Sequence, residues 1–112
     1  MPINVKYNDD TCGKYDDFDN ITDNMNVIYI DCSNNNLTSL PDNMNILFPN
    51  LKGFYCDNNN LTSLPPNMNF PKMKYFNCNN NNLYYILPHI YCYVEKDYNT
   101  KSPKHMKRKL LI

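Results

Sequence analysis

The residues of this chain that would most readily form a structural zinc site are five cysteines and two histidines. Structural zinc sites usually take pairs of ligands that lie about two to four residues apart. The nearest two cysteines, Cys78 and Cys92, are 14 residues apart. His89 and Cys92 are close to each other in the sequence, but one such pair cannot complete a zinc site. The spacing therefore predicts no metal site and no bound cofactor.

The same pair, His89 and Cys92, is the one candidate for a nucleophile and its base. The two side chains would have to lie next to each other, with a third group to orient the base. In a strand with Cys92 facing inward, His89 faces outward, so the pair is separated. The chain has only two glycines and contains no glycine-rich phosphate loop, no G-x-S-x-G motif and no paired-carboxylate motif. We predict no catalytic residues and no enzymatic activity.

Three of the cysteines instead mark an internal repeat. The stretch CSNNNLTSLPDNMN begins at Cys32 and CDNNNLTSLPPNMN begins at Cys56, and twelve of their fourteen positions are identical. A third, more divergent copy is centred on Cys78. The aligned segments are Val27-x-x-Ile30-x-Cys32-x-x-Asn35-x-Leu37-x-x-Leu40-Pro41, then Leu51-x-x-Phe54-x-Cys56-x-x-Asn59-x-Leu61-x-x-Leu64-Pro65, then Met73-x-x-Phe76-x-Cys78-x-x-Asn81-x-Leu83-x-x-Ile86.

This pattern resembles the leucine-rich repeat, L-x-x-L-x-L-x-x-N/C-x-L, whose repeats are about 20–29 residues long. The resemblance implies a helix-poor solenoid of the α/β class with three to four coils. Such a solenoid has a parallel β-sheet on its concave face and irregular or 3₁₀ returns on its convex face. The expected parts are an N-terminal cap segment at 1–26, repeats at 27–50, 51–72 and 73–86 with a partial repeat at 87–94, and a basic C-terminal tail at 95–112.

Alternating residues around each cysteine indicate the elements that would position these side chains. Apolar and polar or aromatic residues alternate with period two, which is typical of a half-buried strand. Ile30 and Cys32 would face the core, and Tyr29 and Asp31 would face away from it. Because prolines in the returns disfavour helix interiors, we expect at most one helical turn, at about 42–47.

A column of asparagines and a column of cysteines are predicted to hold the repeats together. An asparagine side chain both donates and accepts hydrogen bonds, so it can satisfy buried backbone groups of neighbouring turns. A reduced inward-facing cysteine behaves as a small hydrophobic residue. Adjacent strands lie close enough that a disulfide on oxidation stays an alternative. These columns consist of Asn35, Asn59 and Asn81, and of Cys32, Cys56 and Cys78.

The outward-facing strand residues are the candidate partner-binding surface. Tyrosine gives a large contact area at low entropic cost, and the concave face is where leucine-rich repeat proteins usually bind partners, so the resemblance implies a protein partner of unknown identity. The alternative is that these are solvent-tolerant residues in a chain rich in tyrosine and asparagine. The candidate surface comprises Tyr29, Asp31, Ser33, Tyr55, Asp57, Tyr75, Asn77 and Asn79.

Charge is distributed unevenly along a chain whose formal charge is zero. Residues 1–31 carry seven acids and two bases, whereas residues 101–112 carry five bases and no acid. The basic tail allows an alternative function in which it binds nucleic acid or an anionic surface, although a solvated tail is the favoured interpretation. A third alternative is a degenerate repeat protein with no independent activity.

The composition of the chain leads to expectations about the cellular location of the protein and the kind of genome that encodes it. No stretch approaches the roughly 20 apolar residues of a membrane-spanning helix, and the first residues lack the apolar segment of a signal peptide. We therefore expect an intracellular, cytoplasmic protein with reduced cysteines and no membrane contact. The 22 asparagines favour an AT-rich genome such as that of a protist or a large DNA virus, and a viral protein would act in the host cytoplasm. The oligomeric state is left open.

Overall fold

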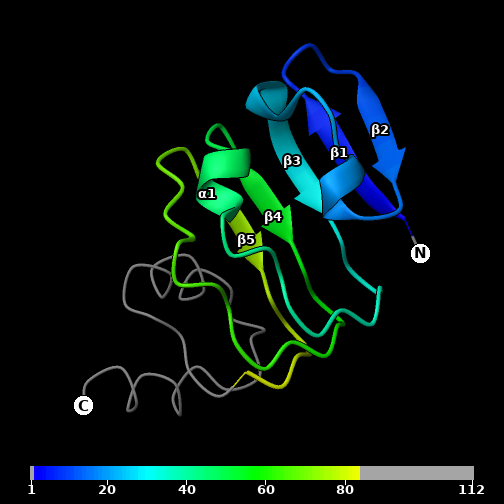
Figure 1. The fold of residues 1–112 in the computed structure, drawn as a ribbon, viewed down its shortest axis with the longest axis vertical. Helices are drawn as coiled ribbons and strands as arrows, with labels where there is room; N and C mark the ends of the chain where they lie inside the picture. Colours follow the sequence, from blue (N-terminus) through cyan, green and yellow to red (C-terminus); the bar gives the residue numbers. More distant parts are fainter. Residues whose placement is uncertain (1, 84–112) are drawn as a thin grey trace.

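The computed structural model describes residues 2–83 of the 112-residue chain. These residues form one five-stranded sheet with three short helical turns (Figure 1). The strands, in the spatial order β2-β1-β3-β4-β5, are β1 (Ile3–Tyr7), β2 (Cys12–Tyr15), β3 (Val27–Asp31), β4 (Gly53–Tyr55) and β5 (Tyr75–Asn77). The helical turns are η1 (Phe18–Asn20), η2 (Asn24–Asn26) and α1 (Met44–Leu47).

The predicted leucine-rich repeat solenoid with an all-parallel sheet is wrong. The sheet is mixed, because β1 runs antiparallel to both β2 and β3, and only the β3–β4 and β4–β5 pairs are parallel. It belongs to a small globular fold whose sheet is neither closed nor coiled into a solenoid. The segment that the repeat pattern left as an irregular cap instead supplies two strands and lies along the free edge of β3.

An N-terminal hairpin explains this difference. In β1, Ile3, Val5 and Tyr7 are buried while the residues between them are more exposed, which is the alternation of a strand with one face on the core. The turn that follows places Asp10 at a positive φ of 70°, a conformation that aspartate tolerates better than most residues. The Tyr7 amide then donates to the carbonyl of Thr11 at 2.8 Å. The chain therefore reverses and returns as β2.

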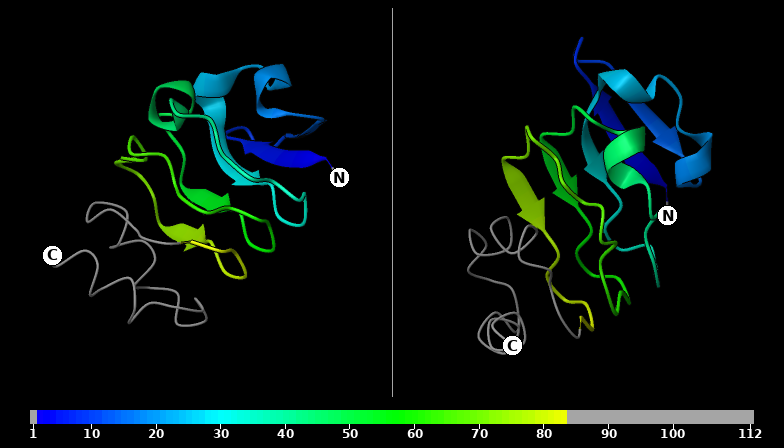
Figure 2. Two further views of the ribbon diagram at one scale, coloured as in Figure 1. Left: turned by 60° about the horizontal axis from the view of Figure 1, so that its bottom comes forward. Right: turned by 60° about the vertical axis from the view of Figure 1, so that its left-hand side comes forward.

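The parallel half of the sheet is built from the repeated segments. Its register aligns Tyr29 with Gly53 and Gly53 with Tyr75, so equivalent repeat positions are neighbours on adjacent strands. Beyond the strand ends, the Cys32 amide donates to the carbonyl of Tyr55 at 2.8 Å, which extends the pairing into the turns. In both views of Figure 2 the segments that follow β3, β4 and β5 run side by side.

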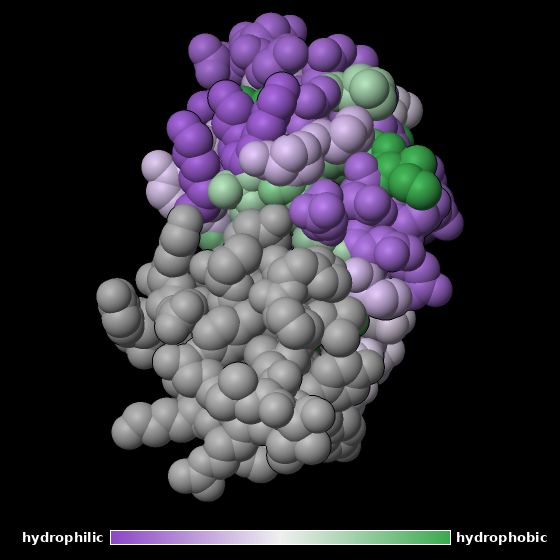
Figure 3. Space-filling model, turned by 90° about the vertical axis from the view of Figure 1, so that its left-hand side faces the viewer, coloured by the Kyte–Doolittle hydropathy of each residue, from purple (hydrophilic) through white to green (hydrophobic). Residues whose placement is uncertain are grey.

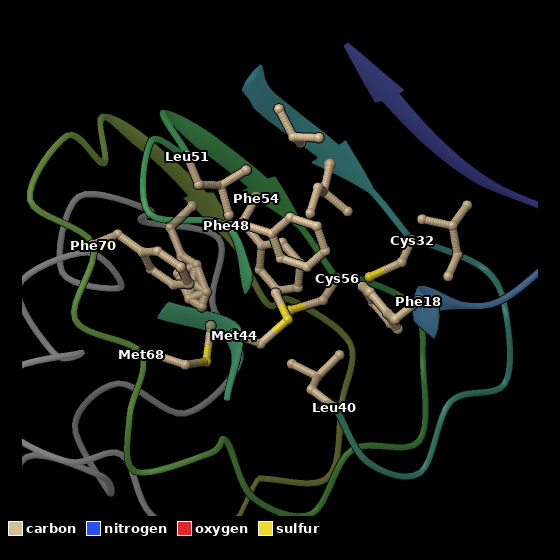
Figure 4. Packing of buried hydrophobic residues seen from close by; sticks show 14 of the residues in the cluster. Phe18, Cys32, Leu40, Met44, Phe48, Leu51, Phe54, Cys56, Met68 and Phe70 are labelled. Atoms are coloured by element: carbon tan, nitrogen blue, oxygen red, sulfur yellow. The ribbon is translucent and has the colours of Figure 1, made fainter. Parts of the chain in front are cut away.

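The core lies between one face of the sheet and the returning segments (Figure 4). The rings of Phe54 and Phe76 stack with their centroids 5.9 Å apart, and Met44 on α1 is fully buried. α1 lies inside the 42–47 segment where the sequence allows one helical turn. No helix among residues 2–83 has both the length and the apolar character needed to cross a bilayer.

Two tyrosines fasten the N-terminal hairpin to the rest of the fold. The hydroxyls of Tyr7 and Tyr15 are 2.5 Å apart, and the Tyr7 hydroxyl donates to the carbonyl of Thr22 at 3.0 Å. Burial, followed by the hydrogen bond with Tyr15, raises the pKa of Tyr7 from 10.0 to about 12. The Tyr15 pKa is lowered by its hydrogen bonds to Thr22 and Tyr7. The Tyr7 hydroxyl therefore keeps its proton to a higher pH than an unperturbed tyrosine does.

This pair predicts a loss of stability at alkaline pH. Because the pKa of Tyr7 is higher in the folded than in the unfolded chain, its protonated form stabilises the fold, and that contribution disappears as the pH rises from 10.0 to about 12. We expect the free energy of unfolding, measured by urea denaturation across this window, to fall less steeply for Tyr7→Phe than for the unmodified protein. Ile46→Ala replaces an exposed residue without a titratable group and should keep the original slope. Equal slopes for all three proteins would contradict the assignment.

Several predictions concern residues outside the described range. These are the last residues of the third repeat (84–86), the partial repeat 87–94 with His89 and Cys92, and the basic tail 95–112. The alternative function through that tail and the proposed boundaries of the segments therefore stay predictions.

Candidate partner-binding face

The face of the sheet that points away from the core collects side chains from all five strands. Register places Lys6 opposite Tyr29 and, on its other side, opposite Cys12. Lys6 and Cys12 therefore share a face with the tyrosines of the repeats. This contribution from β1 and β2 was not predicted from the sequence. The period-two alternation of Asn4 and Lys6 with apolar residues that are buried in the fold is the signal that could have indicated it. The residues that the N-terminal hairpin adds to the predicted face are Asn4, Lys6, Cys12 and Lys14.

Three tyrosines gather around Gly53 on this face, and we call Tyr29, Tyr55 and Tyr75 the tyrosine cluster. Gly53 lies between Tyr29 and Tyr75 in the register, and the centroids of those two rings are only 6.4 Å apart. A Cβ atom on Gly53 would lie 2.4 Å from Cδ1 of Tyr29 and 3.5 Å from Cε2 of Tyr55. The absent side chain of Gly53 therefore allows the rings to converge over β4.

The members of the tyrosine cluster differ in their exposure to solvent. Tyr75 is 52% exposed, whereas Tyr29 and Tyr55 are partly covered. Burial raises the pKa of Tyr55, and the neighbouring Tyr29 and Tyr75 raise it further. Tyr55 therefore carries a protonated hydroxyl at neutral pH, which can donate a hydrogen bond to a partner.

A hollow of about 490 Å³ adjoins the tyrosine cluster on the side of the N-terminal hairpin. This volume lies within the range of roughly 300–1,000 Å³ that is usual for ligand pockets. The hollow combines aromatic rings, two ammonium groups and one carboxylate. Its lining residues are Asn4, Val5, Lys6, Cys12, Gly13, Lys14, Tyr29, Ile30, Asp31 and Tyr55.

The predicted polar residues of this face bind mainly to their own chain. Asp31 Oδ1 accepts from the Ser33 amide at 3.0 Å and from the Ser33 hydroxyl. Asn77 Oδ1 accepts from the Asn79 amide at 2.9 Å in the same way, and Asp57 Oδ2 accepts from the side-chain amide of Asn58 at 3.2 Å. These bonds close the turns at the strand ends, so the polar residues contribute to the shape of the face more than to its free hydrogen-bonding capacity.

Asn59 forms the centre of the predicted asparagine column. Its Nδ2 donates to the carbonyls of Cys32 and Cys56, both at 3.0 Å. Its Oδ1 accepts from the amides of Asn35 at 3.0 Å and Leu37 at 2.9 Å. Asn59 is 5% exposed and is the one buried polar residue in the described part of the chain. One side chain thus joins its own turn to the turn before it.

The other two asparagines repeat parts of this arrangement. Asn81 donates to the carbonyls of Cys56 and Cys78, both at 3.0 Å, and accepts from the Leu61 amide at 2.9 Å. Asn35 donates to the carbonyl of Cys32 at 3.1 Å. Asn35 and Asn81 are both less buried than Asn59. The column therefore links the turns after β3, β4 and β5. The outward face of the sheet depends on these turns.

The cysteines of the repeat lie in the apolar core. Cys32, Cys56 and Cys78 are between 0% and 3% exposed. Burial is the largest cause that raises the pKa of the Cys32 and Cys56 thiols well above the usual range, followed by Asp31 for Cys32 and by the neighbouring thiols for Cys56. Such thiols stay protonated and are poor nucleophiles and poor metal ligands. Among residues 2–83, no group of three or more histidine, cysteine or acidic side chains is placed to hold a metal ion.

Comparison with protein-family models found no match for this chain, and neither did comparisons with curated proteins and with solved structures. The resemblance of the repeated segments to the leucine-rich repeat family therefore stays a prediction from the sequence.

Figure 3 shows the side of the molecule that lies on the left in Figure 1. The coloured surface there is mostly hydrophilic, with hydrophobic residues in small separate areas.

Proposed function

We propose that the protein is a non-enzymatic binding module that engages a protein partner through the outward face of its sheet. The observation that carries this proposal is the tyrosine cluster, in which three rings converge over Gly53 beside a hollow of about 490 Å³. Aromatic side chains that lose water in a complex commonly dominate its binding energy. Rings held in place by their neighbours lose little further entropy when a partner binds.

A cytoplasmic location accompanies this proposal. Cys32 and Cys56 pack as apolar core residues, a role in which thiols are stable in a reducing compartment. The partner is therefore sought among intracellular proteins.

The double variant Tyr55→Ala/Tyr75→Ala tests the proposal. We expect partners that co-purify with the unmodified protein to be lost, because removing two central aromatic contacts commonly weakens a complex roughly 30-fold or more. The measurement is quantitative co-purification from the native cell, with thermal melting to confirm that the variant is folded.

Ile46→Ala provides the matched control. Ile46 is a large exposed apolar residue on α1, which packs on the other side of the sheet. Its replacement should leave the set of partners unchanged. Retention of the same partners by the folded tyrosine variant would contradict the proposal.

A further inference from the structure

The hollow beside the tyrosine cluster has two chemically different sides. The N-terminal hairpin contributes Lys6 and Lys14, whereas β3 and β4 contribute Tyr29 and Tyr55. A ligand that fills the hollow would therefore meet ammonium groups from the N-terminal hairpin and aromatic rings from the repeat strands.

The two lysines are available to an incoming anion. Lys6 Nζ lies 3.5 Å from Asp10 Oδ1 and 5.9 Å from the centroid of the Tyr29 ring. Asp10 is 87% exposed, and ion pairs at such exposed positions are weak, so a carboxylate from a partner can replace it. Lys14 is exposed and forms no ion pair within residues 2–83.

The hollow is lined by a single acid, Asp31, against the two lysines. Asp31 Oδ1 is held by the Ser33 amide at 3.0 Å and by the Ser33 hydroxyl, so hydrogen bonds partly compensate its charge. Beside Asp31, which is the register partner of Tyr55, the rings of Tyr29 and Tyr55 provide neutral apolar surface. The hollow is thus complementary to negative charge at the lysines of the N-terminal hairpin and to a ring or an aliphatic chain at the tyrosines of the repeat strands.

We infer that the partner presents an acidic peptide segment whose carboxylates meet Lys6 and Lys14 and whose neighbouring aromatic side chain lies against Tyr29 and Tyr55. This inference rests on the proposed function and specifies the chemistry of the partner. Electrostatic complementarity of this kind mainly sets the specificity of binding and the rate of association. It also predicts that binding weakens as salt is added.

The test uses the full chain and short fluorescent peptides. In the acidic probe, glutamate alternates with phenylalanine, and two comparison probes carry glutamine or lysine in place of glutamate. Fluorescence anisotropy should give about 3- to 30-fold tighter binding of the acidic probe than of the glutamine probe, as expected for one or two exposed ion pairs. High salt should reduce that difference.

Variants of the two lysines identify the site. Lys6→Gln/Lys14→Gln should remove the preference for the acidic probe, and Lys14→Glu should shift the preference towards the lysine probe. Lys74→Gln is the matched control, because Lys74 is exposed and does not line the hollow. It should leave binding unchanged.

Three results would overturn the inference: no binding of the acidic probe, equal binding of the glutamine probe, or no effect of the lysine variants. These outcomes are distinct from a failure of the proposed function. If cellular partners are lost with Tyr55→Ala/Tyr75→Ala but retained with Lys6→Gln/Lys14→Gln, the sheet face binds protein and the partner is not acidic. If neither double variant changes the partners, both proposals fail.

Discussion

Asn59→Ala is expected to lower the free energy of unfolding by about 3–5 kcal/mol, because each buried polar group that loses its partner costs roughly 1–3 kcal/mol. The replacement would leave the amides of Asn35 and Leu37 without the acceptor that Asn59 supplies. The carbonyls of Cys32 and Cys56 would each lose one bond from Asn59 but keep those from Asn35 and Asn81. Part of this cost would be offset by water entering the cavity. The measurement is equilibrium urea denaturation followed by circular dichroism.

Asn60→Ala is the control for this experiment. Asn60 is the next residue along the same turn and is exposed, so its replacement should change stability by less than about 0.5 kcal/mol. Similar losses for the two variants would show that Asn59 is an ordinary turn residue rather than a link between turns.

Asn59→Asp separates the donor from the acceptor role of the side chain. An aspartate can still accept from the amides of Asn35 and Leu37, but an ionised carboxylate cannot donate to the carbonyls of Cys32 and Cys56. Burial beside these carbonyls should raise the pKa of the new carboxyl group in the folded chain. The variant should therefore be least stable at neutral pH and recover part of its stability as the pH falls.

The repeat pattern could predict which residues occupy equivalent positions in neighbouring repeats, but it could not predict the architecture of the whole sheet. Residues separated by one repeat, such as Tyr29 and Gly53, are neighbours in the parallel register, because both segments enter the sheet at the same point of the repeat. The pattern contains no information about residues 2–26, which lie outside it. In that segment, burial of Ile3 and Val5 produces an antiparallel hairpin, and that hairpin makes the sheet mixed.

The candidate face was predictable only in part, for a related reason. Period-two alternation identifies Tyr29, Tyr55 and Tyr75 as outward-facing, since that property is local to each strand. The hollow depends on β1 pairing with β3 across about 25 residues of sequence, a long-range contact that periodicity does not encode. For the same reason, the sequence did not predict that Lys6 and Lys14 belong to the candidate face.

The role of Gly53 also could not be predicted without the register of the strands. In the sequence it is one of two glycines in the chain, and only the pairing shows that it lies between two tyrosines. This placement leads to a specific prediction about how the face is organised.

Gly53→Ala is expected to disrupt the tyrosine cluster and to weaken partner binding by roughly tenfold or more, in line with the loss of one central contact. The added Cβ would lie 2.4 Å from Cδ1 of Tyr29, so the ring must rotate away from Tyr75. The accompanying strain should cost about 1–3 kcal/mol of stability. Co-purification reports the binding, near-ultraviolet circular dichroism the tyrosine environment, and urea denaturation the stability.

A double-mutant cycle with Tyr29→Ala distinguishes the steric effect from a general weakening of β4. Removing the Tyr29 ring eliminates the clash, so Gly53→Ala should cost much less stability in the Tyr29→Ala background than alone. Binding should not recover, because the ring itself is then missing. Ile46→Ala is the control, because Ile46 is exposed on α1 and does not line the hollow. It should leave both stability and partner binding nearly unchanged. If Gly53→Ala costs the same stability with and without Tyr29, or if it binds partners normally, the ring convergence over Gly53 is not what organises this face.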